Sequence, residues 1–96
     1  MRTKTVTIQI GNTDNKLTQQ LWSKFVLEVD FLFTGTLGVD VHFFGGSVTY
    51  ADWQNVCWVV EISSDIENYI VKNLIEIRRK YLQDSVAWTE GTTKFF

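Results

Sequence analysis

The only histidine and the only cysteine of this 96-residue chain, His42 and Cys57, are the first residues to consider for chemistry. A thiol beside an imidazole is the minimum arrangement for an activated nucleophile. Apolar alternation places both side chains on consecutive strands, on the face directed away from the helices. Because no third residue is marked to orient the imidazole, we expect Cys57 to be a small buried apolar residue and His42 a partly buried polar one. We predict that the two side chains do not meet.

Metal and cofactor chemistry has little support in the sequence. One histidine and one cysteine cannot make a structural zinc site, and no Asp/Glu run has the spacing of a loop that binds a cation. The glycine-rich phosphate loop, the dinucleotide fingerprint, the serine-hydrolase elbow and the Cys-x-x-Cys pair are all absent. We therefore expect no cofactor and no metal.

A loop between two predicted strands carries the strongest recognition signal. Within six residues it combines two aromatic rings with a carboxylate and two amides: Tyr50, Asp52, Trp53, Gln54 and Asn55. Such groups are suited to contact a base, a sugar or a partner's backbone. The alternative is that the loop folds over the sheet edge and buries Trp53 in the core. We predict that the loop from Gly46 to Asn55 is a binding surface.

A second aromatic and charged pair, Trp88 and Glu90, lies beside a predicted turn. An indole next to a charged turn can contact a partner, and we include both residues in the predicted site. The alternative is that Trp88 belongs to the core and that Glu90 belongs only to the turn.

Hydrophobic periodicity defines the elements that position these residues. Period-2 alternation predicts strands, and apolar stripes with period 3.6 predict helices. The predicted strands span 3–10, 39–44, 54–62 and 85–96, the last folding back as a hairpin at Glu90-Gly91, and the predicted helices span 18–33 and 64–82. The order β-α-β-β-α-β is that of an α+β, ferredoxin-like fold: a four-stranded antiparallel sheet with both helices on one face. The first and third strands should be central, and residues 1–96 should form a single domain.

The sequence also predicts how the helices begin. Thr18 is suited to cap the first helix. Ser64 and Glu67 have the spacing of a capping box at the start of the second. Two charged pairs are predicted at i,i+4 spacing on the helix surfaces: Lys24 with Glu28, and Glu76 with Lys80.

In the strand over 39–44, alternation predicts that Val39, Val41 and Phe43 share the helix-facing side. Phe44 and His42 would then lie on the outer face of the sheet, with Cys57 and Val59 from the next strand. An outer face with this apolar content favours pairing with a second copy, so we expect a homodimer or higher oligomer.

Composition narrows the function classes. A net charge of −2 is too small to indicate a basic nucleic-acid footprint, so we expect no nucleic-acid partner. The sequence contains no run of 18 apolar residues, so we expect no membrane span. A single cysteine fits a reducing, cytoplasmic environment. We therefore expect a small non-enzymatic protein that binds a small polar or nucleotide-like ligand, or that inhibits a partner protein. Small phage or mobile-element inhibitors are compatible with this reading. The alternative is a small cytosolic enzyme with a subunit-interface site that uses His42, Cys57 or Glu61.

Overall fold

The computed structural model describes residues 2–12, 16–47, 54–91 and 94–96. Its elements follow the predicted β-α-β-β-α-β order, which confirms the ferredoxin-like α+β fold. Along the chain these are β1 (Thr3–Gly11), α1 (Gln19–Thr34), β2 (Val39–Gly46), β3 (Asn55–Ser63), the short 3-10 helix η1 (Ser64–Ile66), α2 (Glu67–Lys80) and β4 (Ala87–Glu90).

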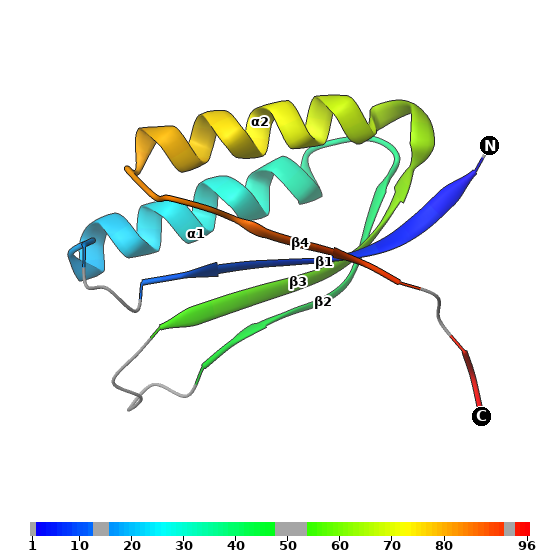
Figure 1. Cartoon of the computed structure of the whole chain (residues 1–96), viewed down its shortest axis with the longest axis horizontal. Coiled ribbons are helices and arrows are strands. Elements are labelled where there is room, and N and C mark those ends of the chain that lie inside the picture. Colours follow the sequence, from blue (N-terminus) through cyan, green and yellow to red (C-terminus); the bar gives the residue numbers. More distant parts are fainter. Residues whose placement is uncertain (1, 13–15, 48–53, 92–93) are drawn as a thin grey trace.

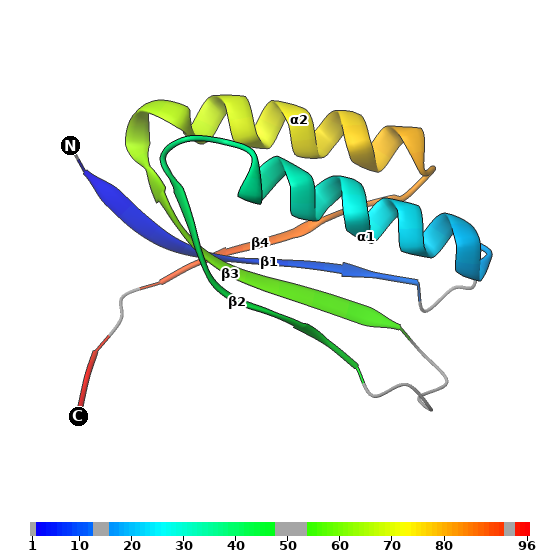
Figure 2. The same ribbon diagram turned by 180° about the vertical axis from the view of Figure 1, so that it is seen from behind.

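The four strands form one antiparallel sheet in the order β2-β3-β1-β4. The predicted central strands, β1 and β3, pair along their whole lengths, from Thr3 opposite Ser63 to Gly11 opposite Asn55. Both helices cover the same face of the sheet, so the molecule has two layers and an open sheet face (Figures 1 and 2).

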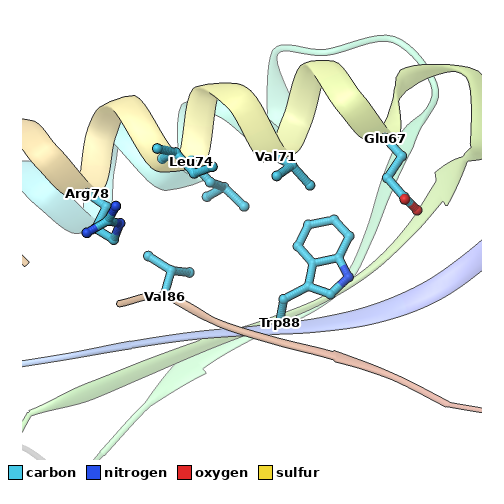
Figure 3. A pocket seen from close by; sticks show the side chains of 7 residues that line it. Glu67, Val71, Leu74, Arg78, Val86 and Trp88 are labelled. Atoms are coloured by element: carbon cyan, nitrogen blue, oxygen red, sulfur yellow. The ribbon is translucent and has the colours of Figure 1, made fainter. Parts of the chain in front are cut away.

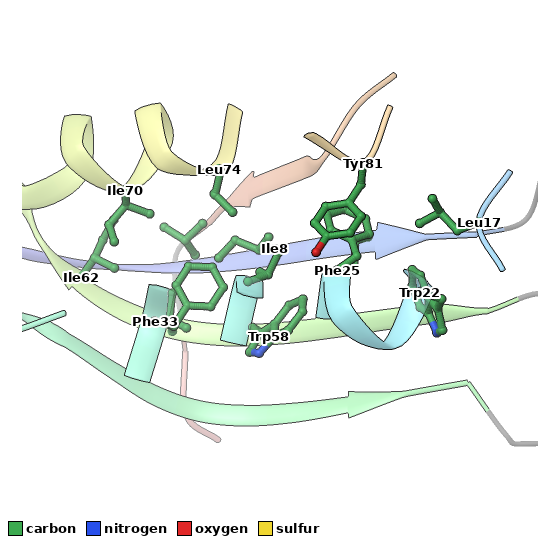
Figure 4. Close-up of a cluster of buried hydrophobic side chains, with 14 residues drawn as sticks. Ile8, Leu17, Trp22, Phe25, Phe33, Trp58, Ile62, Ile70, Leu74 and Tyr81 are labelled. Carbon is green, nitrogen blue, oxygen red and sulfur yellow. The ribbon is translucent and has the colours of Figure 1, made fainter. Parts of the chain in front are cut away.

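The core lies between these layers, and Trp58 is its largest fully buried side chain (Figure 4). Its ring packs edge-on against Phe33 of α1, with the two ring centroids 5.6 Å apart. Its indole Nε1 donates a hydrogen bond of 3.0 Å to the carboxylate of Asp30, also on α1. An indole buried with its N–H satisfied keeps its full apolar contribution without a desolvation penalty.

A β-bulge at His42 corrects the predicted faces of β2. Val41 pairs with Val60, but Phe43 pairs with Val59, so one extra residue lies in β2. The extra residue reverses the alternation beyond it. Phe44 therefore stacks on Trp58 on the helix-facing side, at a centroid distance of 5.3 Å. Phe43 lies on the open face and is 55% exposed, the reverse of the sequence prediction.

The predicted cap of α1 is confirmed, but the predicted capping box of α2 is not. The side chain of Thr18 accepts a hydrogen bond from the Leu21 backbone N–H, which confirms it as the cap of α1. The capping box on α2 is wrong, because Ser64 begins the 3-10 turn and α2 begins only at Glu67, without a side-chain cap. The Glu67 carboxylate instead pairs with Lys4 of β1.

The charged pairs also differ from the predicted ones, because tertiary contacts compete with neighbours on the same helix. Lys80 of α2 donates to Glu28 of α1 at 2.8 Å, which joins the two helices. Burial works to raise the pKa of Glu28, but hydrogen bonds from Lys80 and Tyr81 outweigh it and leave that pKa below its ordinary value. Burial, together with the bond to Glu28, raises the pKa of Tyr81 to about 12.

The described part of the predicted return strand, residues 94–96, is not in a strand. Gly91 does not adopt the positive φ that a two-residue hairpin turn requires of its glycine. Residues Lys94–Phe96 lie outside any strand, with Phe95 and Phe96 exposed. Thr93, which the predicted return strand includes, lies outside the described residues.

Replacing Glu28 by glutamine should change how stability depends on pH. A carboxyl whose pKa is lowered by folding stabilises the protein above its unfolded pKa, and that stability is lost as the pH falls through the folded pKa. We expect the stability difference between wild type and Glu28→Gln to be largest above the ordinary value of 4.5 and to shrink below it. Chemical denaturation across the pH range measures this. Glu76→Gln is the control, and a difference independent of pH would contradict the assignment.

Gly38 should tolerate alanine much less well than Gly91. It has a φ of 91°, and an added Cβ would lie 2.8 Å from the Ser63 Oγ. We expect Gly38→Ala to reduce the free energy of unfolding by about 1–3 kcal/mol. Gly91→Ala, where an added Cβ meets nothing within 4 Å, should change it by less than about 0.5 kcal/mol. Equal effects in a denaturation experiment would refute this difference.

Candidate functional site

An apolar groove opens between α2 and β4, at the edge of the sheet (Figure 3). We call it the edge groove; it has a volume of about 270 Å³ and is lined by Glu67, Val71, Leu74, Ile75, Arg78, Val86 and Trp88. The α2 residues 67, 71, 74 and 78 recur at helical spacing, so they share one face of the helix. Valine, leucine and isoleucine make its wall on the α2 side, and charged groups lie only at its two ends.

Trp88 makes most of the wall on the β4 side. Its register partner on β1 is the buried Ile8, so its side chain lies on the helix-facing side of the sheet. The indole Nε1 donates a hydrogen bond of 3.0 Å to Glu90 Oε1, two residues along the same strand. The polar edge of the ring is therefore satisfied from outside the groove, and the apolar face remains to meet a ligand.

An ionic cluster closes one end of the groove. Lys4 of β1 pairs with Glu90 at 3.1 Å and with Glu67 of α2. The hydrogen bond from Trp88, and then the one from Lys4, lower the pKa of Glu90. Hydrogen bonds to Glu67 and Glu90 raise the pKa of Lys4. Lys4 and Glu90 are therefore both ionised near neutral pH. By formal charge, two carboxylates against one ammonium make this end negative.

Arg78 marks the other end. One nitrogen of its guanidinium, Nη1, donates to the backbone carbonyls of Gln83 at 2.9 Å and Asp84 at 3.2 Å. These bonds hold the segment that connects α2 to β4. A guanidinium carries five N–H donors, so it can also bind a carboxylate.

Of the seven residues predicted as a site, the structure brings Trp88 and Glu90 together. Tyr50, Asp52 and Trp53 lie outside the described residues. Gln54 has a structural role, because its carboxamide exchanges hydrogen bonds of 2.7 and 2.9 Å with Gln19 of α1.

Two further hydrogen bonds fix Gln54 and Asn55, at the end of the predicted binding loop. The same Gln54 side chain accepts a bond of 3.1 Å from the buried Asn12. Asn55 opens β3 with an exposed side chain, and its backbone N–H donates to Ser47 Oγ at 3.2 Å.

Sequence reasoning missed the α2 side of the edge groove. Helical periodicity predicts one buried stripe on this helix, and the structure places all of its members in or against the core: Ile66, Ile70, Leu74, Ile77 and Tyr81. Val71 and Ile75 form a second apolar row beside that stripe. The signal available in the sequence was that the apolar stripe of α2 is wider than burial against the core requires.

The predicted separation of His42 and Cys57 agrees with the strand register. Cys57 pairs with Gly45 on β2 and Gln9 on β1, whereas His42 lies at the bulge with its Nε2 3.5 Å from Glu61 Oε1. Burial raises the pKa of the Cys57 thiol, which favours the unreactive protonated form. In the described ranges, no group of three or more His, Cys, Asp or Glu residues could hold a metal ion. Within the same ranges, no helix is long and apolar enough to cross a membrane.

Comparison with known proteins shows the fold alone. No family model matches the chain, and no curated protein matches it. Among solved structures, the C-terminal domain of the MgtC protein from Mycobacterium tuberculosis is similar, with a TM-score of 0.62 and 8% identity over 92% of this chain and 87% of that domain. The de novo designed protein Foldit4 is also similar, with a TM-score of 0.62 and 15% identity over 97% of this chain and all of that one. At these identities the likeness extends to the ferredoxin-like architecture and not to a site.

Replacing Trp88 by phenylalanine should raise the pKa of Glu90. The substitution keeps an aromatic ring in the groove but removes the N–H that is the largest cause of the lowered pKa. Carboxyl carbon NMR during an acid titration would measure the shift toward the ordinary value. Trp22→Phe, on α1, is the control. An unchanged Glu90 pKa in Trp88→Phe would show that the indole does not hold this carboxylate.

Proposed function

We propose that this protein is a non-enzymatic binding module that receives an extended segment of a partner protein along β4. The segment adds a strand to the sheet through backbone hydrogen bonds, and its alternate apolar side chains enter the edge groove. The observation that carries the proposal is an apolar groove, walled by an indole with a satisfied N–H, directly beside a sheet edge.

The two sheet edges differ in how well they accept a strand. β2 is the longer edge, but its bulge at His42 and the charged Asp40 beside it disfavour pairing. β4 pairs with β1 in regular register, and no described residue pairs with its other side. The edge groove lies only on the β4 side, so backbone pairing and side-chain burial are available together there.

Charge sets the direction of the segment. β4 runs from the Arg78 end of the groove to the Glu67 end (Figure 3). An antiparallel strand would therefore enter beside Glu67 and Glu90 and leave beside Arg78. The complementary segment has a basic residue first, apolar residues at alternate positions, and an acidic residue last. Glu67 and Arg78 lie roughly 16 Å apart along α2, which spans about five extended residues.

Self-association and location remain part of the proposal. The open sheet face presents Phe43, Val59, Cys57, Thr7 and Thr89, and a second copy would cover this face without blocking the edge groove. We expect the protein to act in the cytoplasm. If the bound segment belonged to the active site of an enzyme, this module would act as an inhibitor. Small phage inhibitors would be one example. The small-ligand form of the hypothesis depends on the loop at 48–53, which lies outside the described residues.

A synthetic peptide tests the groove directly. We expect acetyl-Lys-Thr-Val-Thr-Val-Thr-Glu-amide, in which the Lys, the two Val and the Glu share one face of an extended strand, to bind with a dissociation constant on the order of 100 μM. Its backbone amide shifts in NMR should centre on β4 and α2. The same peptide with the terminal Lys and Glu exchanged should bind several-fold more weakly, because both charges would then face like charges.

A matched pair of variants distinguishes binding in the edge groove from nonspecific hydrophobic binding. Ile75→Glu puts a carboxylate at the groove wall and should abolish binding, whereas Leu27→Glu, at an exposed leucine on α1, should leave it unchanged. Binding that survives Ile75→Glu, or that ignores peptide charge order, would refute the proposal. Light scattering on wild type and Phe43→Glu tests the expected dimer separately.

A further inference from the structure

The start of α1 and the end of α2 lie at the same end of the helical layer (Figure 1). A second groove lies there. We call it the lysine groove; it has a volume of about 520 Å³ and is lined by Lys16, Leu17, Leu21, Lys24, Lys80, Tyr81 and Leu82. Leu17 and Tyr81 are buried and form its floor, while Leu21 and Leu82 are exposed. Among the described residues, its lining therefore combines an apolar base with three ammonium groups and no carboxylate.

Leu82 is the unusual residue of this groove. It is the only described non-glycine residue with a positive φ, 56°, and it follows the end of α2. Its backbone N–H donates to the Arg79 carbonyl and that of Gln83 donates to the Arg78 carbonyl, so the helix ends in a left-handed cap. Glycine occupies such a position at least cost, because a side chain there is strained. Yet the leucine side chain is 79% exposed, so packing does not offset the strain.

Strain without compensating burial indicates a role in binding. An exposed leucine beside an apolar floor gains burial only when something covers it. The rim defines the charge of that occupant. Lys16 pairs with Asp84, and Lys80 with Glu28, while Lys24 has no acidic partner within the described ranges. The side chains of Lys16 and Lys80 are 44% and 61% exposed, and exposed ion pairs exchange partners at little cost.

We propose that the lysine groove binds a free single-chain anionic amphiphile: a carboxylate, sulfate or phosphate head at Lys24, with a tail of roughly ten carbons over Leu17, Leu21 and Leu82. The volume lies in the range of small-molecule sites, roughly 300–1,000 Å³. A protein partner would need about 800 Å² on each side, far more than the groove presents. This site goes beyond the proposed function and lies on a different part of α2 from the edge groove.

Titration with sodium dodecanoate, kept below its critical micelle concentration, tests the proposal. We expect saturable amide shifts at Leu21, Tyr81 and Leu82 in NMR, with a dissociation constant on the order of 1 mM or tighter. Dodecyltrimethylammonium has the same tail with a cationic head and should bind at least tenfold more weakly. Acetate, which has the head without the tail, should not bind measurably.

Two variants test the roles of strain and charge. Leu82→Gly should raise the melting temperature by a few degrees, because it relieves the strained cap. The same change should weaken dodecanoate binding about tenfold, because the tail loses an apolar wall. Lys24→Gln should weaken it about two- to fivefold. Leu37→Gly, at an exposed leucine in the loop after α1, is the matched control and should keep wild-type affinity.

Any of three results would overturn the proposal. One is the absence of saturable shifts with dodecanoate. Another is wild-type affinity in Leu82→Gly. The last is binding to vesicles of anionic phospholipid without binding to monomeric dodecanoate, which would assign the surface to a bilayer instead.

Discussion

The contacts of one side chain, Trp58, connect three elements of this fold. From the centre of β3 its ring meets Phe33 of α1 edge-on and Phe44 of β2 face-on, and its N–H reaches Asp30. The stack with Phe44 is possible only because β2 gains a residue at His42. With regular alternation Phe44 would point to the open face. The bulge and the buried indole therefore depend on each other, because the bulge turns Phe44 of β2 to cover Trp58 of β3.

Short-range patterns explain how much of the fold could be predicted from the sequence. The alternation of Val6, Ile8 and Ile10, and the apolar stripes of the helices, concern residues a few positions apart, and the structure confirms them. Apart from the return strand after Glu90, the errors involve residues distant in the sequence. Glu28 pairs with Lys80 on the other helix, and Glu67 pairs with Lys4 instead of completing a capping box. The bulge at His42 is a property of two strands, which the alternation within one strand cannot reveal.

The candidate site divides in the same way. Trp88 and Glu90 were found from their types and their closeness in the chain. Lys4 and Arg78 complete the edge groove from β1 and from α2, and nothing near them in the sequence indicates this. Gln54 shows the opposite error, because its recognition-type side chain ties β3 to the start of α1 through Gln19 and Asn12. A polar side chain in a loop can serve a ligand or its own fold equally well, and only its partners distinguish the two.

The position of β1 has a consequence for how the chain folds as it is synthesised. Both strands that flank β1 come from the second half of the sequence, and Lys4 meets Glu90 across 86 positions. Translation at roughly 5–20 residues per second separates the appearance of β1 and β4 by several seconds. Throughout that interval an amphipathic strand has no completed sheet to join. Contacts this distant in the sequence slow folding, because the loop they close must be ordered first. The nascent chain therefore depends on the early hairpin of β2 and β3 to offer β1 its first partner.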